Sequence, residues 1–98
     1  METFQEIIAS KTPVLVDFYA DWCGPCKAMS PVIKEVADLV KGKARVIKVN
    51  IDKAEAAAMK YHVSAVPTFI IFKNGESVWR HAGMIDKQSL LKTIESNS

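Results

Sequence analysis

The chain has 98 residues, of which 49% are hydrophobic and 24% are charged, and its formal net charge is +2 at pH 7. This composition indicates a single soluble domain, covering residues 1–98, and excludes an intrinsically disordered chain. Because basic and acidic residues are interspersed and the apolar runs are short, we expect neither nucleic acid nor a membrane as a partner.

The N-terminal residues, METFQEIIASK, lack the basic region and the apolar stretch of a secretory signal. Without a signal the default compartment is the cytoplasm, where structural disulfides are rare. Phe4, Ile7 and Ile8 instead form one face of a short predicted helix.

Beyond this helix the hydrophobic periodicity predicts alternating strands and helices. Asn74-Gly75 is a strong hairpin signal, and Asp86 is a typical helix N-cap. Helical crossovers make the first two strands parallel, and the hairpin adds an antiparallel pair, so we expect an α/β domain with a mixed sheet. In chain order the expected elements are strands at 14–19 and 45–52 with a helix at 25–42 between them, a helix at 54–61, a hairpin over 68–83 and a helix at 86–96.

The hexapeptide WCGPCK, residues 22–27, contains the only two cysteines of the chain, Cys23 and Cys26. Such a pair can be a redox couple, half of a metal site or a structural disulfide. A zinc site needs a full tetrahedral set of ligands, and only His62 and His81 could join the pair. The compartment and the very short loop disfavour a structural disulfide. A redox couple is favoured, because this spacing between a strand and a helix is typical of one.

The position of the two cysteines supports redox chemistry. Cys26 lies in the first turn of the predicted helix, where Pro25 is well tolerated. The free N–H groups and the dipole at a helix N-terminus stabilise the thiolate of Cys23, which is the nucleophilic form. Residues three apart on a helix have Cβ atoms about 5–6 Å apart, so dithiol and disulfide can share nearly one backbone.

On DFYADWCGPCK, NID, VPTFIIFKNGE and the glycine of HAGM, the chain resembles the thioredoxin family over nearly its whole length. The resemblance implies the thioredoxin fold and a general protein-disulfide reductase. It implies that Cys23 attacks a protein disulfide and that Cys26 resolves the mixed disulfide. It implies no cofactor beyond the redox-active disulfide. The implied partners are a flavoprotein, thioredoxin reductase, which supplies the reducing equivalents, and disulfide-containing protein substrates.

Three further residues match family positions close to the cysteines. Asp17 matches a buried aspartate thought to help deprotonate the resolving cysteine, and Lys48 matches the lysine near it. An acid within VLVDFY is also expected, on its own, to be desolvated with a raised pKa. The alternatives are an acid and a lysine that both point outward into solvent. Pro67 matches a cis-proline facing the sulfurs, and its alternative is an ordinary strand-entry proline.

The resemblance also implies a substrate-docking surface of small and flat residues around the sulfurs. A cis-proline loop would leave the backbone of Val66 free to pair with an extended substrate. Taken alone, Ile51 and Met84 would fit ordinary core packing better than a docking role. The positions that match the docking surface are Trp22, Gly24, Pro25, Ile51, Val66, Pro67, Gly83 and Met84.

Two features depart from the family pattern. The first family strand is missing, so we expect a four-stranded sheet with the strand at 45–52 on an edge, and a monomer with some tendency to dimerise. Tyr19 stands where the family commonly has tryptophan, which leaves the fine tuning of the site open. A disulfide oxidase or isomerase is disfavoured because Gly24-Pro25 resembles the reducing members. A redox-inactive binding module would show a lost cysteine or a large insertion, and neither is present.

Overall fold

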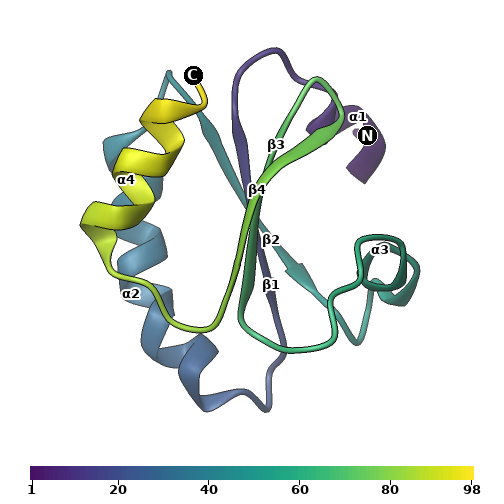
Figure 1. Cartoon of the computed structure of the whole chain (residues 1–98). Coiled ribbons are helices and arrows are strands. Elements are labelled where there is room, and N and C mark those ends of the chain that lie inside the picture. The colour runs from purple at the N-terminus through teal and green to yellow at the C-terminus, as the bar shows by residue number, and fades with distance from the viewer.

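The helices and strands of the computed structural model, which describes all of residues 1–98, follow the expected alternating order (Figure 1). None of the helices combines the length and the apolar character needed to cross a membrane. The elements are α1 (Phe4–Ile8), β1 (Val14–Tyr19), α2 (Gly24–Leu39), β2 (Arg45–Asn50), α3 (Glu55–Lys60), β3 (Thr68–Lys73), β4 (Glu76–Ala82) and α4 (Lys87–Ser96).

The four strands form one mixed sheet in the order β2-β1-β3-β4. β1 pairs in parallel with β2, whereas β3 is antiparallel to both β1 and β4. The expected mixed sheet and the edge position of β2 are therefore confirmed. Tyr19 is paired with Asn50 and Phe18 with Thr68, so β1 and β2 end where β3 begins. Figure 1 shows the start of α2 and the loop that follows β4 at this same end of the sheet.

Local residue choices explain most element boundaries. Asn74 and Gly75 have φ values of 54° and 81°, the left-handed conformation that a tight hairpin turn requires. The side chain of Asp86 accepts a hydrogen bond from the N–H of Ser89 at 3.1 Å and caps α4, as predicted.

Three predicted elements have bounds that are wrong by a few residues. α2 ends at Leu39 rather than at Gly42, because the N–H groups of Lys43 and Ala44 turn back to the carbonyl of Val40. β2 ends at Asn50 rather than at residue 52, since the carbonyl of Asn50 accepts hydrogen bonds from Lys53 and Ala54. α3 is shorter than residues 54–61, because Ala54 and Tyr61 are its capping residues.

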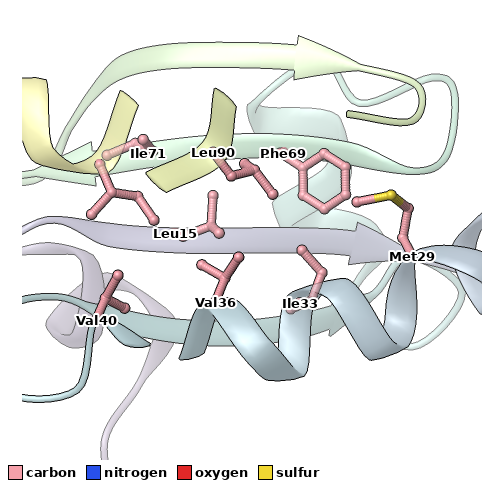
Figure 2. Close-up of a cluster of buried hydrophobic side chains, with 9 residues drawn as sticks. Leu15, Met29, Ile33, Val36, Val40, Phe69, Ile71 and Leu90 are labelled. Atoms are coloured by element: carbon pink, nitrogen blue, oxygen red, sulfur yellow. The ribbon is translucent and has the colours of Figure 1, made fainter. Parts of the chain in front are cut away.

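The apolar core has two parts, one on each face of the sheet. Side chains alternate along a strand, so Val14, Val16 and Phe18 of β1 pack on the face that α1 and α3 cover. Leu15 lies on the opposite face, under α2 and α4 (Figure 2). Burial of each large aliphatic or aromatic side chain stabilises the fold by about 1.5–3 kcal/mol. The α2 side of the core consists of Leu15, Met29, Ile33, Val36, Val40, Phe69, Ile71, Leu90 and Ile94.

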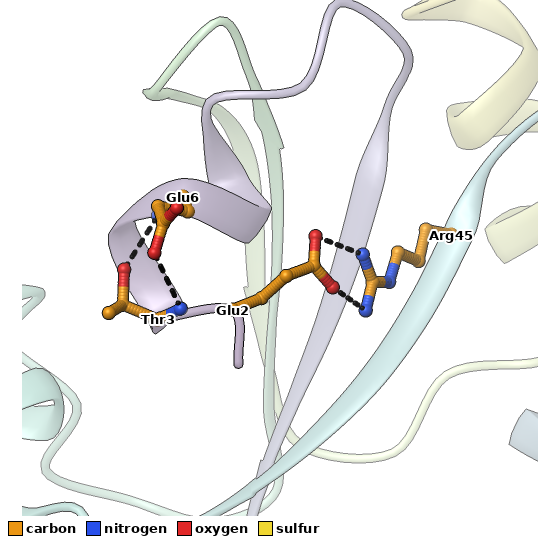
Figure 3. Close-up of polar contacts among 4 residues, drawn as sticks. All are labelled: Glu2, Thr3, Glu6 and Arg45. Carbon is orange, nitrogen blue, oxygen red and sulfur yellow. Dashed lines mark hydrogen bonds and ion pairs between the residues drawn. The ribbon is translucent and has the colours of Figure 1, made fainter.

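The N-terminus is tied to the edge strand by polar contacts (Figure 3). Thr3 and Glu6 form a reciprocal capping box at the start of α1, with hydrogen bonds of 3.0 and 3.1 Å. The carboxylate of Glu2 forms an ion pair with the guanidinium of Arg45 in β2, with N–O distances of 2.8 and 3.1 Å. This pair fixes the first residues of the chain beside the start of β2.

Candidate redox site

Cys23 and Cys26 lie where β1 leads into α2 and are joined by a disulfide, with their Cα atoms 5.3 Å apart. Cys23 is the N-cap of α2, and the N–H of Cys26 donates a hydrogen bond to the sulfur of Cys23 at 3.1 Å. Gly24 and Pro25 form the first helical positions, so the predicted strand-to-helix setting is confirmed. A negative charge on the Cys23 sulfur would be stabilised by this N–H and by the helix dipole.

Asp17 is buried, with 3% of its surface exposed, on the central strand β1. One of its carboxylate oxygens has no hydrogen-bond partner. Burial raises the pKa of Asp17 to about 6, and the positive charge of Lys48, its register partner in β2, lowers it in part. The prediction of a desolvated acid is confirmed, and the solvent-pointing alternative is wrong. A carboxyl that titrates near neutral pH can take up and return a proton at the pH where thiols react.

A surface cavity of about 350 Å³ opens beside Cys26. The ammonium of Lys48 lies 4.6 Å from the centre of the Tyr19 ring, within the range of a cation–π contact. Lys48 is exposed, yet this contact holds its charged end at the cavity rather than free in solvent. The cavity is lined by Tyr19, Ala20, Asp21, Cys26, Lys27, Ser30 and Lys48.

The loop before β3 lies close to the cysteines. The peptide bond between Val66 and Pro67 is cis, as the resemblance implies. The carbonyl of Pro67 accepts a hydrogen bond from the N–H of Gly83 at 2.8 Å, which links this loop to the end of β4. Val66 and Ile51 are half-buried against the two cysteines. Neither backbone group of Val66 has a hydrogen-bond partner, so both are available to an extended chain.

Two large apolar side chains near the site are exposed. Trp22 is 69% exposed and Met84 is 56% exposed. Ordinary core packing is therefore wrong for Met84, whereas Ile51 does contribute to packing, against both the cysteines and the core on the α3 side. The imidazole of His81 lies 3.1 Å from the carbonyl of Met84 and helps to order the turn around Gly83. Exposed apolar groups beside a reactive disulfide are suited to contact with another protein.

One polar partner in the site was not predicted. The indole N–H of Trp22 donates a hydrogen bond of 2.9 Å to the carboxylate of Asp52. Because β1 and β2 are parallel, the residues just beyond their carboxyl ends meet at one edge of the sheet. That rule could have placed Asp52 near Trp22, but the sequence carries no signal for which side chains would bond.

Of the predicted site residues, Cys26 and Lys48 line the same cavity. Cys23 is joined to Cys26 by the disulfide, and Asp17 is the register partner of Lys48. The structure places Trp22, Gly24, Pro25 and the loop of Val66 and Pro67 around the sulfurs at the same end of the sheet. Gly83 is bonded to Pro67, and Met84 follows it on the surface. The predicted residues thus gather at one end of the molecule, and none of them lies at the hairpin end.

Comparisons with known proteins agree with this geometry. A family model described as "Thioredoxin" matches residues 1–96. Thioredoxin 1 of Nostoc sp. is 43% identical over 93 residues, which cover 95% of this chain and 87% of the relative. Thioredoxin of Rickettsia felis is also 43% identical over 93 residues, covering 95% of this chain and 89% of that protein. A chloroplastic thioredoxin Y of Oryza sativa is 44% identical, over 96% of this chain but only 56% of its own length.

A solved structure of a mutant thioredoxin from Halobacterium salinarum superposes with a TM-score of 0.86 at 39% sequence identity. The match covers 95% of this chain and 80% of that structure. The fold is therefore shared with this solved thioredoxin.

Proposed function

The chain belongs to the thioredoxin family and is a thiol–disulfide oxidoreductase with a disulfide-reductase role, and we propose that Cys23 is its attacking thiol and Cys26 its resolving thiol. The observation that carries this assignment is the hydrogen bond from the N–H of Cys26 to the Cys23 sulfur at the start of α2. This N–H would stabilise a thiolate at Cys23, and it gives no such stabilisation to a thiolate at Cys26.

The proposed cycle conserves atoms and electrons. The Cys23 thiolate attacks one sulfur of a protein disulfide, the substrate S–S bond breaks, and the other substrate sulfur leaves as a thiolate. Cys26 then loses its proton and attacks the Cys23 sulfur of the mixed disulfide. The second substrate thiol is released, and the protein keeps the two-electron oxidised form, the Cys23–Cys26 disulfide. The substrate leaves as a dithiol.

We assign the proton acceptor for Cys26 to Asp17, with Lys48 as its positioning charge. Asp17 is buried on the α2 face of β1, and its pKa of about 6 allows it to be ionised at neutral pH while it still binds a proton readily. The charge of Lys48 favours the ionised form of this carboxyl. The cavity beside Cys26 gives a path for the proton between the thiol and solvent.

The exposed surface around the sulfurs supports the docking of folded protein substrates. The free backbone groups of Val66, next to the cis-Pro67, can pair with an extended substrate strand. Gly24 and Pro25 leave little bulk above the disulfide. A flat apolar rim is supplied by the remaining docking residues, Trp22, Ile51, Gly83 and Met84. A monomer with a single disulfide at one end suits such transient contacts.

The disulfide is proposed as the sole redox group, with no bound cofactor. A flavoprotein thioredoxin reductase would then return two electrons per cycle. A cytoplasmic location is proposed on the same basis, because such a reductant maintains dithiols in a reducing compartment.

Reduction of insulin disulfides with dithiothreitol as the electron donor tests this function. We expect turnover with the wild-type protein, none with Cys23→Ser, and a trapped mixed disulfide with Cys26→Ser. Wild-type turnover equal to that of Cys23→Ser would refute the reductase mechanism. A mixed disulfide trapped by Cys23→Ser in place of Cys26→Ser would reverse the order of the two thiols.

A further inference from the structure

The outer edge of β2 is unpaired. β2 is hydrogen-bonded only to β1. The N–H of Arg45, at the start of β2, and the N–H of Ile51, just after its end, both point inward. They donate to carbonyls just before β1 and at its end. Backbone direction alternates along a parallel ladder, so the N–H groups of Val46, Lys48 and Asn50 point outward. A free edge of this kind can accept another strand.

A basic groove runs beside this edge. The cavity next to Cys26 and a second one of about 290 Å³ share Ser30 and Lys48, and together they follow the line between α2 and β2. The combined lining of the two cavities contains three lysines, Lys27, Lys34 and Lys48, and one carboxylate. None of the three lysines forms an ion pair, since the pairs in the structure are Glu2–Arg45 and Glu35–Lys87.

The one acid of the groove, Asp21, lies at its cysteine end and already accepts a hydrogen bond from the Asn50 side chain at 3.3 Å. The far end contains no acid: it is lined by Lys34, Val46 and small or apolar side chains of α2. The groove therefore combines free backbone donors, an apolar floor and unpaired positive charge.

We propose that this groove binds an extended, acidic segment of a protein substrate, which adds to the sheet as a strand beside β2. Val46 and Lys48 direct their side chains to the α2 face, so alternate side chains of the added strand would face the lysines. Lys27 and Lys34 are two helical turns apart, about 10 Å, and one face of a strand presents a side chain roughly every 7 Å. Acidic residues at alternate positions would meet them.

Charge argues against a second copy of this chain as the occupant. Pairing of β2 with another β2 would bring two sets of the same three lysines together, and like charges at close range disfavour the complex. Glu2, the acid beside the start of β2, is already paired with Arg45 and offers the lysines no free counter-charge. An acidic partner would be attracted by the same three lysines that would repel a second copy. The inference rests on the proposed function, because the segment belongs to a disulfide-bearing substrate.

Two disulfide-bridged peptides that share one cysteine pair test the proposal. One has a flanking strand-forming segment with Glu at alternate positions, and the other has Lys at those positions. At low salt we expect the wild-type protein to have the lower KM for the Glu peptide. Lys34→Glu should raise that KM about fivefold, leave kcat unchanged, and lower the KM for the Lys peptide. Salt at molar concentration should remove the difference.

Lys92→Glu, on the exposed surface of α4, is the matched control, because it changes net charge equally without touching the groove. A direct readout uses the oxidised protein, which cannot react, with a cysteine-free Glu peptide. Amide hydrogen exchange at Val46 and Lys48 should slow when this peptide binds.

Three other outcomes would each refute a different statement. Equal KM values for the two peptides, with insulin still reduced, would overturn the groove and leave the reductase function intact. Loss of insulin reduction would refute the function, while the exchange experiment would still decide on the groove. Protection of Val46 and Lys48 that rises with protein concentration, in the absence of peptide, would show a second copy on β2 and overturn the acidic segment.

Discussion

Leu15 and Asp17 lie two residues apart on the same face of β1, and both are almost completely buried. Around Leu15 the face is closed by apolar side chains of α2, β3 and α4 (Figure 2). Around Asp17 the charge of Lys48 lies nearby, and one carboxylate oxygen of Asp17 has no hydrogen-bond partner. One strand face therefore changes within two residues from a position that stabilises the fold to one that costs stability.

This difference shows where stability has been exchanged for chemistry. Burial of a carboxylate without hydrogen bonds opposes folding, because the charged form loses its hydration. The same burial gives Asp17 a pKa of about 6, which suits the proton-acceptor role that we propose for it. The stability that the apolar core around Leu15 supplies offsets the cost of burying Asp17 on the same strand face.

The largest expected effect comes from removing the stabilising half of the comparison. Leu15→Ala should lower the free energy of unfolding by about 2–5 kcal/mol, because the packed neighbours leave a cavity. Denaturant unfolding measures it. Val78→Ala, on an exposed part of β4, is the control and should change stability by less than about 0.5 kcal/mol. Similar losses for both variants would contradict the contrast between core and surface.

Asp17→Asn should have the next largest effect, in the opposite direction. The pKa of Asp17 in the folded protein, about 6, lies above its ordinary value of 3.8, so the folded state binds this proton more tightly. Stability from that proton is complete below pH 3.8 and is lost as the pH rises through 6. The Asn variant stays neutral and should be more stable by about 2–3 kcal/mol at pH 7, with the gain disappearing near pH 4.

Unfolding of the oxidised protein across this pH range gives the measurement, and a gain independent of pH would contradict it. The same variant should slow release from the mixed disulfide more than the initial attack, because only release needs the Cys26 proton removed. Equal slowing of both steps in single-turnover kinetics would remove Asp17 from the base role.

Much of this contrast could be predicted from the sequence, but not all of it. The apolar run 14–19 with one acid was sufficient to predict a buried strand and a perturbed carboxyl, and the WCGPCK turn placed the cysteines at the start of a helix. The end of α2 was misjudged because Gly42 serves in the turn beyond the helix, where its φ is 87°. Periodicity identifies helix faces better than it identifies their last hydrogen bonds.

Contacts between side chains of different elements were beyond sequence reasoning. The bond from Trp22 to Asp52 and the position of Lys48 over Tyr19 depend on how far each strand twists and which rotamer is chosen. The groove between α2 and β2 depends in the same way on where the helix crosses the sheet. The exposure of Met84 likewise depends on how the elements pack, because Met84 alone would fit a core position in the sequence.

Lys48→Met should give a smaller effect, confined to the Asp17 half of the comparison. Loss of the ammonium removes the charge that lowers the pKa of Asp17, so that pKa should rise further. NMR titration of the Asp17 carboxyl carbon provides the measurement. Lys48→Arg keeps the charge and should titrate close to wild type. An unchanged titration in Lys48→Met would mean that burial alone determines the pKa of Asp17.

Tyr19→Leu should have the smallest effect, because it acts on Asp17 only through Lys48. A cation–π contact at a partly exposed site contributes about 0.5–1 kcal/mol, and its loss frees the ammonium to move into solvent. The charge then acts on Asp17 for less of the time, so the pKa of Asp17 should rise, though less than in Lys48→Met. Tyr19→Phe keeps the ring and should match wild type. If Tyr19→Leu and Tyr19→Phe titrate alike, the ring does not hold Lys48, and the difference between Asp17 and Leu15 arises from burial and the lysine charge alone.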